Sequence, residues 1–231
     1  VVITASHNPP EYNGLKVVGR RALSLSYDTG LSKIEELISS GKLPSADWRK
    51  VGNYKQLDWK EEYMDTLLNK INLEKKLRVV VDIGNGAGGI IEDAFKSLDT
   101  EVKCLFKEPD GRFPNHIPDP LREETLEVLR REVVSEGADM GIALDGDCDR
   151  VGFVDEKGRA IGGDAAMMIY AKDVLYRSPS AELIVNVLAS KATSEYISGL
   201  GGRVRMVRVG HSYIMSELMS SGALMAGELS G

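Results

Sequence analysis

Short runs of branched apolar residues alternate with segments of helical periodicity along most of this chain. The run at 77–83, LRVVVDI, is typical of a buried strand, and the glycine-rich GNGAGG after it is expected to open a helix that reaches about residue 98. Because parallel strands need crossover connections, this alternation predicts an α/β protein with largely parallel pairing. The same periodicity predicts further strands at 101–106, 138–144, 151–154, 182–187, 203–209 and 223–227, and helices at 122–137, 164–176, 190–199 and 211–221.

The order of elements starts again in the second half of the chain, which predicts two similar α/β domains at 56–157 and 158–231. Residues 1–55, with a helix at about 31–40 and a polar link near 44–56, are interpreted as the last part of a third unit. The chain begins without Met inside an apolar run and stops at GELSG. We therefore interpret it as a fragment truncated at both ends.

Composition excludes several classes of partner. Lys and Arg total 29 against 35 Asp and Glu, so the net charge is −6 and no basic stripe is available for nucleic acid. No window approaches the roughly 18 apolar residues of a membrane span, and the start lacks the pattern of a signal peptide, so we expect a cytoplasmic protein without membrane association. With only Cys104, Cys148 and three histidines, no disulfide framework or zinc spacing arises, and any metal should be bound by oxygen.

Ser6 lies in the segment TASHNPPEYNGLK, directly after an apolar strand-like run. The two prolines after Asn8 exclude a helix and fix an exposed turn that presents Ser6 and His7 at the end of the strand. A serine on a turn is ordinarily only a turn residue. It can carry a phosphoryl group only where cations and a metal neutralise the phosphate, so other segments must supply them.

Three alternating aspartates, Asp145, Asp147 and Asp149, occupy LDGDCDRVG after a predicted strand. Such spacing can bring three carboxylates onto one cation, and close carboxylates repel each other without one. Mg²⁺ fits best, because it prefers oxygen ligands and leaves room for phosphate oxygens. The alternatives are a solvated acidic turn or an EF-hand loop, and the EF-hand fails because Arg150 stands where its glycine is required.

Two glycine-rich segments remain. In AGELSG, Glu228 and Ser230 offer a carboxylate and a hydroxyl between glycines, which suits sugar hydroxyls but also an ordinary turn. The segment GNGAGG at 84–89 matches neither the dinucleotide fingerprint nor the P-loop, so tight turning and close helix packing are the favoured interpretation.

In combination, these loops resemble the α-D-phosphohexomutase family. TASHNPPEYNGLK resembles its phosphoserine loop, DGDCDR its metal loop and GELSG its sugar-binding loop, while DGRFPNHIPDP and VRVGHSYI resemble two further family segments. The resemblance covers almost the whole chain. It implies repeated α/β/α domains with mixed, largely parallel four-stranded sheets: the C-terminal part of domain 1 (1–55), domain 2 (56–157) and a truncated domain 3 (158–231).

The resemblance also implies residue roles. Ser6 would be the phosphoserine, His7 and Lys16 would hold the phosphate and the reacting hydroxyl, and Arg150 would contact substrate or phosphate. The implied Mg²⁺ ligands are Asp145, Asp147, Asp149 and the phosphate on Ser6, and the implied sugar-side residues are Gly210, His211, Ser212, Glu228 and Ser230, with the last two at the 3- and 4-hydroxyls.

The implied reaction interconverts hexose 1-phosphate and hexose 6-phosphate. Phosphorylated Ser6 would give its phosphoryl group to the free hydroxyl, and the bound 1,6-bisphosphate would turn over before the other phosphate returns to Ser6. The implied cofactors are one Mg²⁺ per site and a sugar 1,6-bisphosphate as activator. Phosphoryl transfer depends on positioning and charge neutralisation, which Mg²⁺, Lys16 and Arg150 would provide.

The sequence departs from the family pattern in four places. Cys148 replaces the usual glycine of the metal loop, so its backbone is expected to avoid conformations reserved for glycine and its thiol to pack. Leu188 stands where a lysine is usual, and Lys191 follows one helical turn later. The start of domain 1 and all of domain 4 are absent, from which we hypothesise that the chain binds Mg²⁺ but turns over poorly.

Substrate preference is the finer question. NPPEYNG and GELSG favour a phosphomannomutase/phosphoglucomutase acting on mannose and glucose phosphates. The alternatives are a phosphoglucosamine mutase or a catalytically inactive family member that binds sugar phosphates. A haloacid-dehalogenase-like phosphatase would need a different aspartate motif and would stay active after Ser6→Ala. No apolar stripe marks an interface, so no oligomeric state is predicted.

Overall fold

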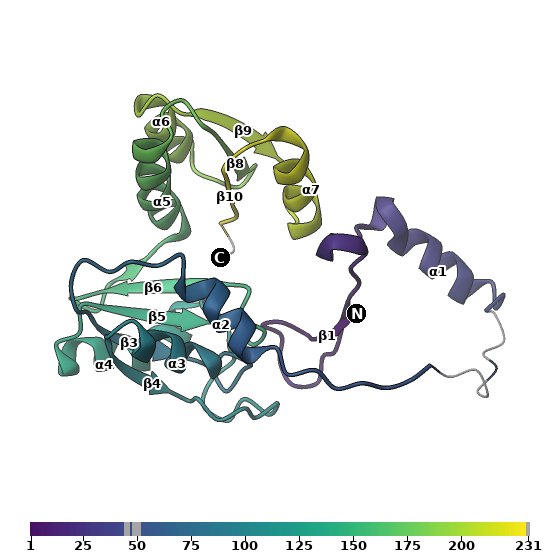
Figure 1. Cartoon of the computed structure of the whole chain (residues 1–231), viewed down its shortest axis with the longest axis horizontal. Helices are drawn as coiled ribbons and strands as arrows, with labels where there is room; N and C mark the ends of the chain where they lie inside the picture. Colours follow the sequence, from purple (N-terminus) through teal and green to yellow (C-terminus); the bar gives the residue numbers. More distant parts are fainter. Residues whose placement is uncertain (44–46, 48–51, 230–231) are drawn as a thin grey trace.

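The structure is a computed structural model that describes residues 1–43, 47 and 52–229. Figure 1 shows a first unit whose N-terminal strands and loops lie against the middle unit, while its helix α1 stands apart from the other two units. A two-residue antiparallel pair precedes the helices of the first unit, and the expected helix at 31–40 is present as α1. Its elements are β1 (Val2–Ile3), β2 (Leu15–Lys16), η1 (Arg20–Ala22), η2 (Tyr27–Leu31) and α1 (Ser32–Ser39). Much of the polar link predicted near 44–56 lies outside the described residues.

The middle unit is built on a mixed sheet. Three of its strands run parallel, and two antiparallel strands extend one edge. The order is β4 (Glu101–Leu105), β3 (Arg78–Asp82), β5 (Met140–Leu144), β6 (Val151–Asp155) and β7 (Ala160–Ile161). The expected number of four strands is wrong here, because the chain turns back at Gly158 (φ +75°) and adds β7 to the edge.

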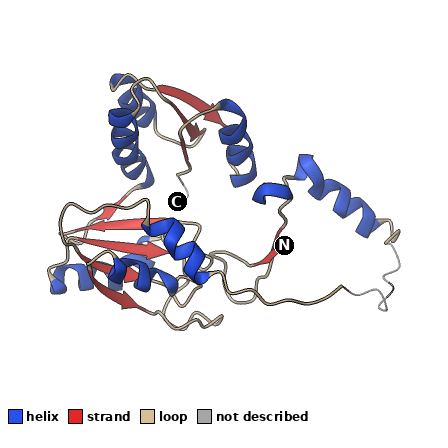
Figure 2. Cartoon of the chain, viewed as in Figure 1, coloured by secondary structure: helices blue, strands red, loops and turns tan. Residues whose placement is uncertain are grey.

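Helices cover both faces of this sheet (Figure 2) because β3 is apolar on both sides. Val79 and Val81 face the cluster that contains Phe95, whereas Val80 faces the cluster with Leu129 and Val133. The helices are α3 (Ile90–Ser97), η4 (Glu123–Leu126) and α4 (Glu127–Glu136). Helix α4 ends at Gly137, which has the left-handed conformation that glycine commonly adopts just after the last residue of a helix. One further helix, α2 (Lys60–Leu68), was not predicted, because its residues are mostly exposed and weakly amphipathic.

The last unit repeats the plan with a parallel sheet in the order β10 (Met225–Gly227), β8 (Glu182–Asn186) and β9 (Arg203–Val207). Leu183 and Val185 pack with α5 and α6, while Ile184 packs with Ile214 of α7 on the opposite face. The helices are α5 (Gly163–Arg177), α6 (Lys191–Gly199) and α7 (His211–Ser221). Within the described residues this sheet has three strands, so the four-stranded expectation does not hold for it either.

The GNGAGG segment turns tightly and leads directly into a helix, as expected. Gly84 and Asn85 both have a φ of +57°, which is a left-handed turn conformation, and α3 begins at Ile90, right after the last glycine. The segment follows the carboxyl end of β3, and the aspartate loop follows the carboxyl end of the neighbouring β5. Both loops therefore lie at the sheet edge where ligands commonly bind in α/β proteins.

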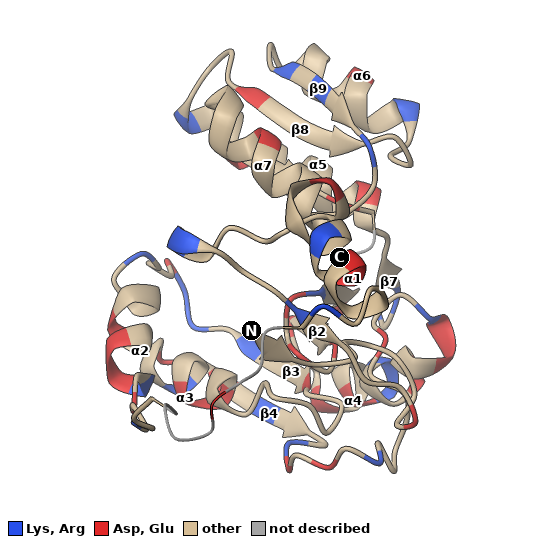
Figure 3. Cartoon of the chain, turned by 90° about the vertical axis from the view of Figure 1, so that its right-hand side faces the viewer, with Lys and Arg blue, Asp and Glu red and all other residues tan. Residues whose placement is uncertain are grey.

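Charged residues of both signs occur on the same elements, as Figure 3 shows, and the segments in grey there are not described. Among the described residues, no helix combines the length and the apolar character needed to cross a bilayer.

Candidate active site

Ser6 lies at a tight turn between β1 and β2. Its φ of +56° places it in the left-handed region, and its N–H donates to Thr4 Oγ1 at 2.9 Å. The Ser6 hydroxyl donates a 2.7 Å hydrogen bond to Oδ2 of Asp145, and His7 Nδ1 lies 3.3 Å from the same hydroxyl. The turn therefore presents Ser6 directly to the aspartate loop of the middle unit.

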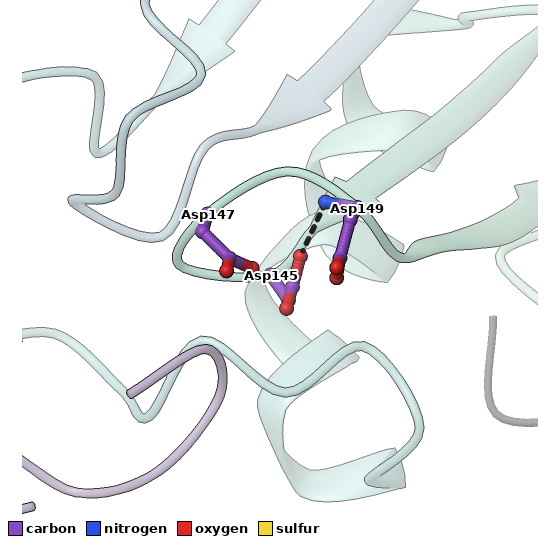
Figure 4. Close-up of side chains that lie close together, drawn as sticks. All are labelled: Asp145, Asp147 and Asp149. Atoms are coloured by element: carbon purple, nitrogen blue, oxygen red, sulfur yellow. Dashed lines mark hydrogen bonds between the residues drawn. The ribbon is translucent and has the colours of Figure 1, made fainter. Parts of the chain in front are cut away.

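The three predicted aspartates form one cluster after β5. One carboxylate oxygen from each of Asp145, Asp147 and Asp149 lies within 4.8 Å of the others. Figure 4 shows the three side chains on one loop, with the Asp149 N–H donating to Asp145 Oδ1 at 3.0 Å. The Arg150 N–H donates to the same oxygen at 3.0 Å, so the loop curls around Asp145. This is an aspartate group that could bind a metal.

The electrostatics of the cluster differ from one aspartate to the next. Burial raises the pKa of Asp145, which is fully inaccessible, and the charges of Asp147 and Asp149 raise it further against the hydrogen bond from Ser6. Burial also acts to raise the pKa of Asp147, but the hydrogen bond and charge of Lys16 outweigh it and lower the pKa. The neighbouring Lys16 ammonium thus favours the ionised form of Asp147.

Lys16 supplies one such cation from β2. Its Nζ donates to Asp147 Oδ2 at 2.6 Å and to Asp149 Oδ2 at 2.5 Å. Burial acts to lower the pKa of Lys16, but the hydrogen bonds and charges of both carboxylates raise it, so the side chain stays protonated. Within the described part of the chain, buried Asp147 Oδ1 has no hydrogen-bond partner. A hard cation bound among the three carboxylates would satisfy that oxygen, so the residues present fit Mg²⁺.

The predicted sugar-side residues belong to the last unit and lie together. His211 begins α7, and the preceding Gly210 has a φ of +128°, which favours glycine. The Gly210 N–H donates to Glu228 Oε1 at 2.9 Å, which links the GHS segment to the residue after β10. Ser230 lies outside the described residues.

Residues of all three units line one cavity of about 350 Å³. Of the predicted site residues, it is lined by Ser6, Lys16, Asp149, Arg150, His211, Ser212 and Glu228. His7, Asp145, Asp147 and Gly210 lie beside or behind these residues and do not line it. The structure therefore places the serine, the aspartate loop and the sugar-side loop around one space.

Sequence reasoning missed part of the site. Leu25 and Leu31 form an apolar wall of the cavity, and nothing in their local pattern separates them from ordinary helix-flanking residues. It also missed Thr4, whose hydroxyl holds the backbone of Ser6; a polar residue at the end of the apolar VVITA run was the available signal.

Cys148 and Leu188 are the two positions at which the sequence departs from the residue usual in the family. The expectation for the Cys148 backbone is wrong: its φ of +62° lies in the left-handed region, because the loop must turn tightly to return its N–H to Asp145 O. Its thiol packs close to Gly88, as expected. Leu188 is 61% exposed, Lys191 pairs with Glu195 at 3.0 Å, and neither residue lines the cavity.

Comparison with known proteins assigns three consecutive parts of the chain to three domains of one protein family. Sequence models of the phosphoglucomutase/phosphomannomutase α/β/α domains I, II and III match residues 1–44, 61–158 and 162–231. The phosphomannomutase/phosphoglucomutase of Pseudomonas aeruginosa is 41% identical over 232 residues, covering 100% of this chain and 49% of that protein. The phosphomannomutase of Escherichia coli is 38% identical over 238 residues, covering 100% and 52%.

Solved structures agree. A phosphoglucomutase/phosphomannomutase family protein from Burkholderia thailandensis has a TM-score of 0.91 at 36% identity, over 99% of this chain and 49% of that one. The repeated α/β/α fold and the serine–aspartate site thus define the phosphohexomutase class. The chain belongs to the phosphoglucomutase/phosphomannomutase family. It spans about half the length of the curated relatives it matches.

Proposed function

We propose that the protein carrying this chain interconverts hexose 1-phosphates and hexose 6-phosphates, using Ser6 as the phosphoryl carrier. The observation that carries the proposal is the 2.7 Å hydrogen bond between the Ser6 hydroxyl and Asp145, at the wall of a cavity that Glu228 also lines. A serine beside Lys16, Arg150 and an aspartate cluster that could hold a cation suits phosphoryl transfer, because those positive charges can neutralise the phosphate on it. The names of the relatives support the same reaction class.

In the forward step, a sugar hydroxyl attacks phosphorus on phosphorylated Ser6. A new P–O bond forms to the sugar as the bond to Ser6 Oγ breaks, and the hydroxyl proton is passed on so that Ser6 recovers its O–H. In the return step Ser6 Oγ attacks the phosphorus of the other phosphate, a P–O bond to Ser6 forms as the P–O bond to the sugar breaks, and the Ser6 proton is passed to the sugar oxygen that leaves. Asp145 Oδ2, which already accepts the Ser6 hydrogen bond, would orient the Ser6 hydroxyl for this attack.

Charge control falls to the residues around Ser6. Lys16 and Arg150 face the cavity beside Ser6 and would bind the oxygens of the transferred group. Mg²⁺ held by Asp145, Asp147 and Asp149 would supply further neutralisation of those oxygens. His7, whose Nδ1 lies 3.3 Å from the Ser6 hydroxyl, would orient the serine.

The sugar would be bound from the last unit. Glu228 is oriented by the Gly210 N–H and faces the cavity with His211 and Ser212, and we assign Glu228 and Ser230 to sugar hydroxyls. Names of relatives that contain phosphomannomutase and phosphoglucomutase support mannose and glucose phosphates as substrates. A sugar 1,6-bisphosphate would serve as the activator. A protein with such substrates is expected in the cytoplasm.

The decisive experiment is to incubate the purified chain with glucose 1,6-bisphosphate and Mg²⁺ and to map phosphate by peptide mass spectrometry. We expect one phosphoryl group on the peptide that contains Ser6, and none on Ser6→Ala. Ser26→Ala is a matched control, since that serine lies in the same unit and only caps η2. Phosphate on another residue, or on none, would contradict the proposal.

A further inference from the structure

A histidine and a carboxylate are buried together behind the aspartate loop. His116 Nε2 lies 3.0 Å from Asp82 Oδ2, and His116 Nδ1 lies 2.9 Å from the backbone oxygen of Ile117. The Asp82 side chain is 1% exposed, and that of His116 is 16% exposed. Neither residue lines the active-site cavity. The proposed reaction gives them no task.

The hydrogen bonds decide the charge of this histidine. A backbone carbonyl and a carboxylate are both acceptors, so both ring nitrogens of His116 must donate and the ring must be an imidazolium. Burial acts to lower the pKa of His116, but the hydrogen bonds to Asp82 and Ile117 and the charge of Asp82 outweigh it and raise the pKa above 6.5. Asp82 is the titratable group that contacts the ring, and the other close ring is Phe106.

This ion pair fixes the turn that contains Pro118. Asp82 Oδ1 accepts the Gly84 N–H at 2.9 Å, and a Cβ at Gly84 would lie 3.0 Å from Pro118 Cβ. The ion pair therefore ties together the carboxyl end of β3, the GNG turn and the FPNHIPDP segment. Close packing against Gly84 then restricts Pro118 to one position.

Gly146 lies between Asp145 and Asp147 in the aspartate loop, and Pro118 packs close to it. A Cβ there would lie 3.4 Å from Pro118 Cγ on one side and would collide with the backbone oxygen of Ser6 on the other. On a third side the Gly146 oxygen accepts the Ala87 N–H at 2.9 Å. Pro118, the GNGAGG turn and the Ser6 turn thus meet on one glycine of the aspartate loop.

We infer that His116 and Asp82 are positioning residues, whose buried ion pair holds Pro118 against Gly146 and thereby sets the geometry of the aspartate loop for its cation. The inference rests on the proposed function, because it assumes that the aspartate loop binds Mg²⁺. The FPNHIPDP segment touches no substrate in the proposed reaction. The inference gives this segment an effect on metal affinity that acts through Pro118 and Gly146.

The first test compares Mg²⁺ affinity, measured by calorimetry on the 231-residue chain, between the parent and His116→Gln. Glutamine cannot donate a charged hydrogen bond to both acceptors, so we expect Mg²⁺ to bind about five- to tenfold more weakly, at the lower end of what outer-shell changes cost. Arg130→Gln is the matched control, because Arg130 holds Gly158 O far from Gly146 and its loss should leave Mg²⁺ affinity unchanged. Equal affinity in His116→Gln and the parent would overturn the inference.

The second test separates positioning from bulk stability. In Asp82→Asn the amide can still accept from Gly84 and can donate to a neutral His116, so the hydrogen bonds survive without the charge. We expect this variant to show no pH trend in Mg²⁺ affinity and to bind Mg²⁺ within about twofold of the parent at pH 6.5, whereas parent affinity falls as His116 deprotonates at higher pH. A parent without that alkaline loss would overturn the inference.

The two proposals fail in different ways. A parent chain that binds no Mg²⁺ would remove the proposed metal site and the inference with it. A parent that binds Mg²⁺ with the same affinity as His116→Gln would leave the proposed function standing and remove only the positioning role. Nuclear magnetic resonance of the imidazoles offers a direct check, since the chain has three histidines, and His116 should titrate above 6.5.

Discussion

The Ser6 hydroxyl and the Asp145 carboxylate, 139 residues apart in sequence, are joined by a 2.7 Å hydrogen bond. The bond crosses from the first unit to the middle unit, so the proposed phosphoryl carrier and the aspartate loop proposed to bind the metal come from different parts of the chain. Because Asp145 is fully buried, this contact forms only when the two units are docked. Several consequences can be measured on the chain itself.

Docking depends on the absence of a side chain at Gly146. In Gly146→Ala the new methyl group would meet the Ser6 backbone oxygen, so the Ser6 turn or the aspartate loop must move. We expect a loss of roughly 1–3 kcal/mol in the free energy of unfolding, typical of overpacking, together with faster proteolysis near Ser6. Urea denaturation and limited proteolysis measure the two effects.

The control is Gly111→Ala, because a Cβ at Gly111 would meet no atom within 4 Å. It should unfold at the same urea concentration as the parent and resist proteolysis equally. If Gly146→Ala behaved like this control, the close contact between Ser6 and Gly146 would not exist in solution.

Lys16 should compete with the metal in the unphosphorylated chain. Its ammonium contacts Asp147 and Asp149, the carboxylates that we assign to Mg²⁺. In Lys16→Met we therefore expect Mg²⁺ to bind about fivefold more tightly, corresponding to the ~1 kcal/mol interaction of two unit charges about 4 Å apart in water. Phosphorylation of Ser6 by glucose 1,6-bisphosphate should nevertheless become slower, since a cation that binds phosphate is lost.

Lys42→Met removes an exposed positive charge of the same unit that has no place in the site, and it should change neither quantity. Weaker Mg²⁺ binding in Lys16→Met than in this control would mean that Lys16 supports the cation instead of competing with it. Calorimetry and the rate of Ser6 phosphorylation, measured on the same preparations, distinguish the two cases.

Both thiols should be unreactive in the folded chain. Burial raises the pKa of Cys148 to about 11, with smaller contributions from the three aspartates, and burial likewise raises the pKa of Cys104 to about 11. At pH 8 we expect alkylation by iodoacetamide about a hundredfold slower than for a free cysteine, because the thiolate is the reacting form. In urea both should react at the ordinary rate, and a thiol that reacts equally fast in folded and unfolded chain would contradict the burial of that cysteine.

Much of this fold follows from periodicity. β3 was predictable because Val79, Val80 and Val81 leave no polar face, which is the signature of a strand covered on both sides. The α7 range was predicted without error because Gly210 and Gly222 punctuate it at both ends. The strand β7 escaped prediction because two residues carry no periodic signal, and its place is decided by the turn at Gly158.

The site was predictable in its residue types and not in its contacts. The spacing of Asp145, Asp147 and Asp149 pointed to a cation without any structure, since local sequence places them on one loop. Nothing local reveals that Lys16 pairs with two of them or that Gly146 meets Ser6, because these contacts depend on how separate units dock. For the same reason the FPNHIPDP segment could be matched to a family but given no physical role.

The last prediction concerns stability and pH at His116. Its pKa is raised in the folded chain, since the bonds to Asp82 and Ile117 outweigh the effect of burial, whereas the unfolded value is about 6.5. The ion pair therefore contributes its full stabilisation below pH 6.5, and the contribution disappears as the pH rises through the folded-state pKa. With EDTA present to remove metal, the difference in free energy of unfolding between the parent and His116→Gln should be largest near pH 6 and shrink toward pH 9. A difference for His116→Gln that stayed constant or grew with pH would show that the histidine is neutral in the folded chain.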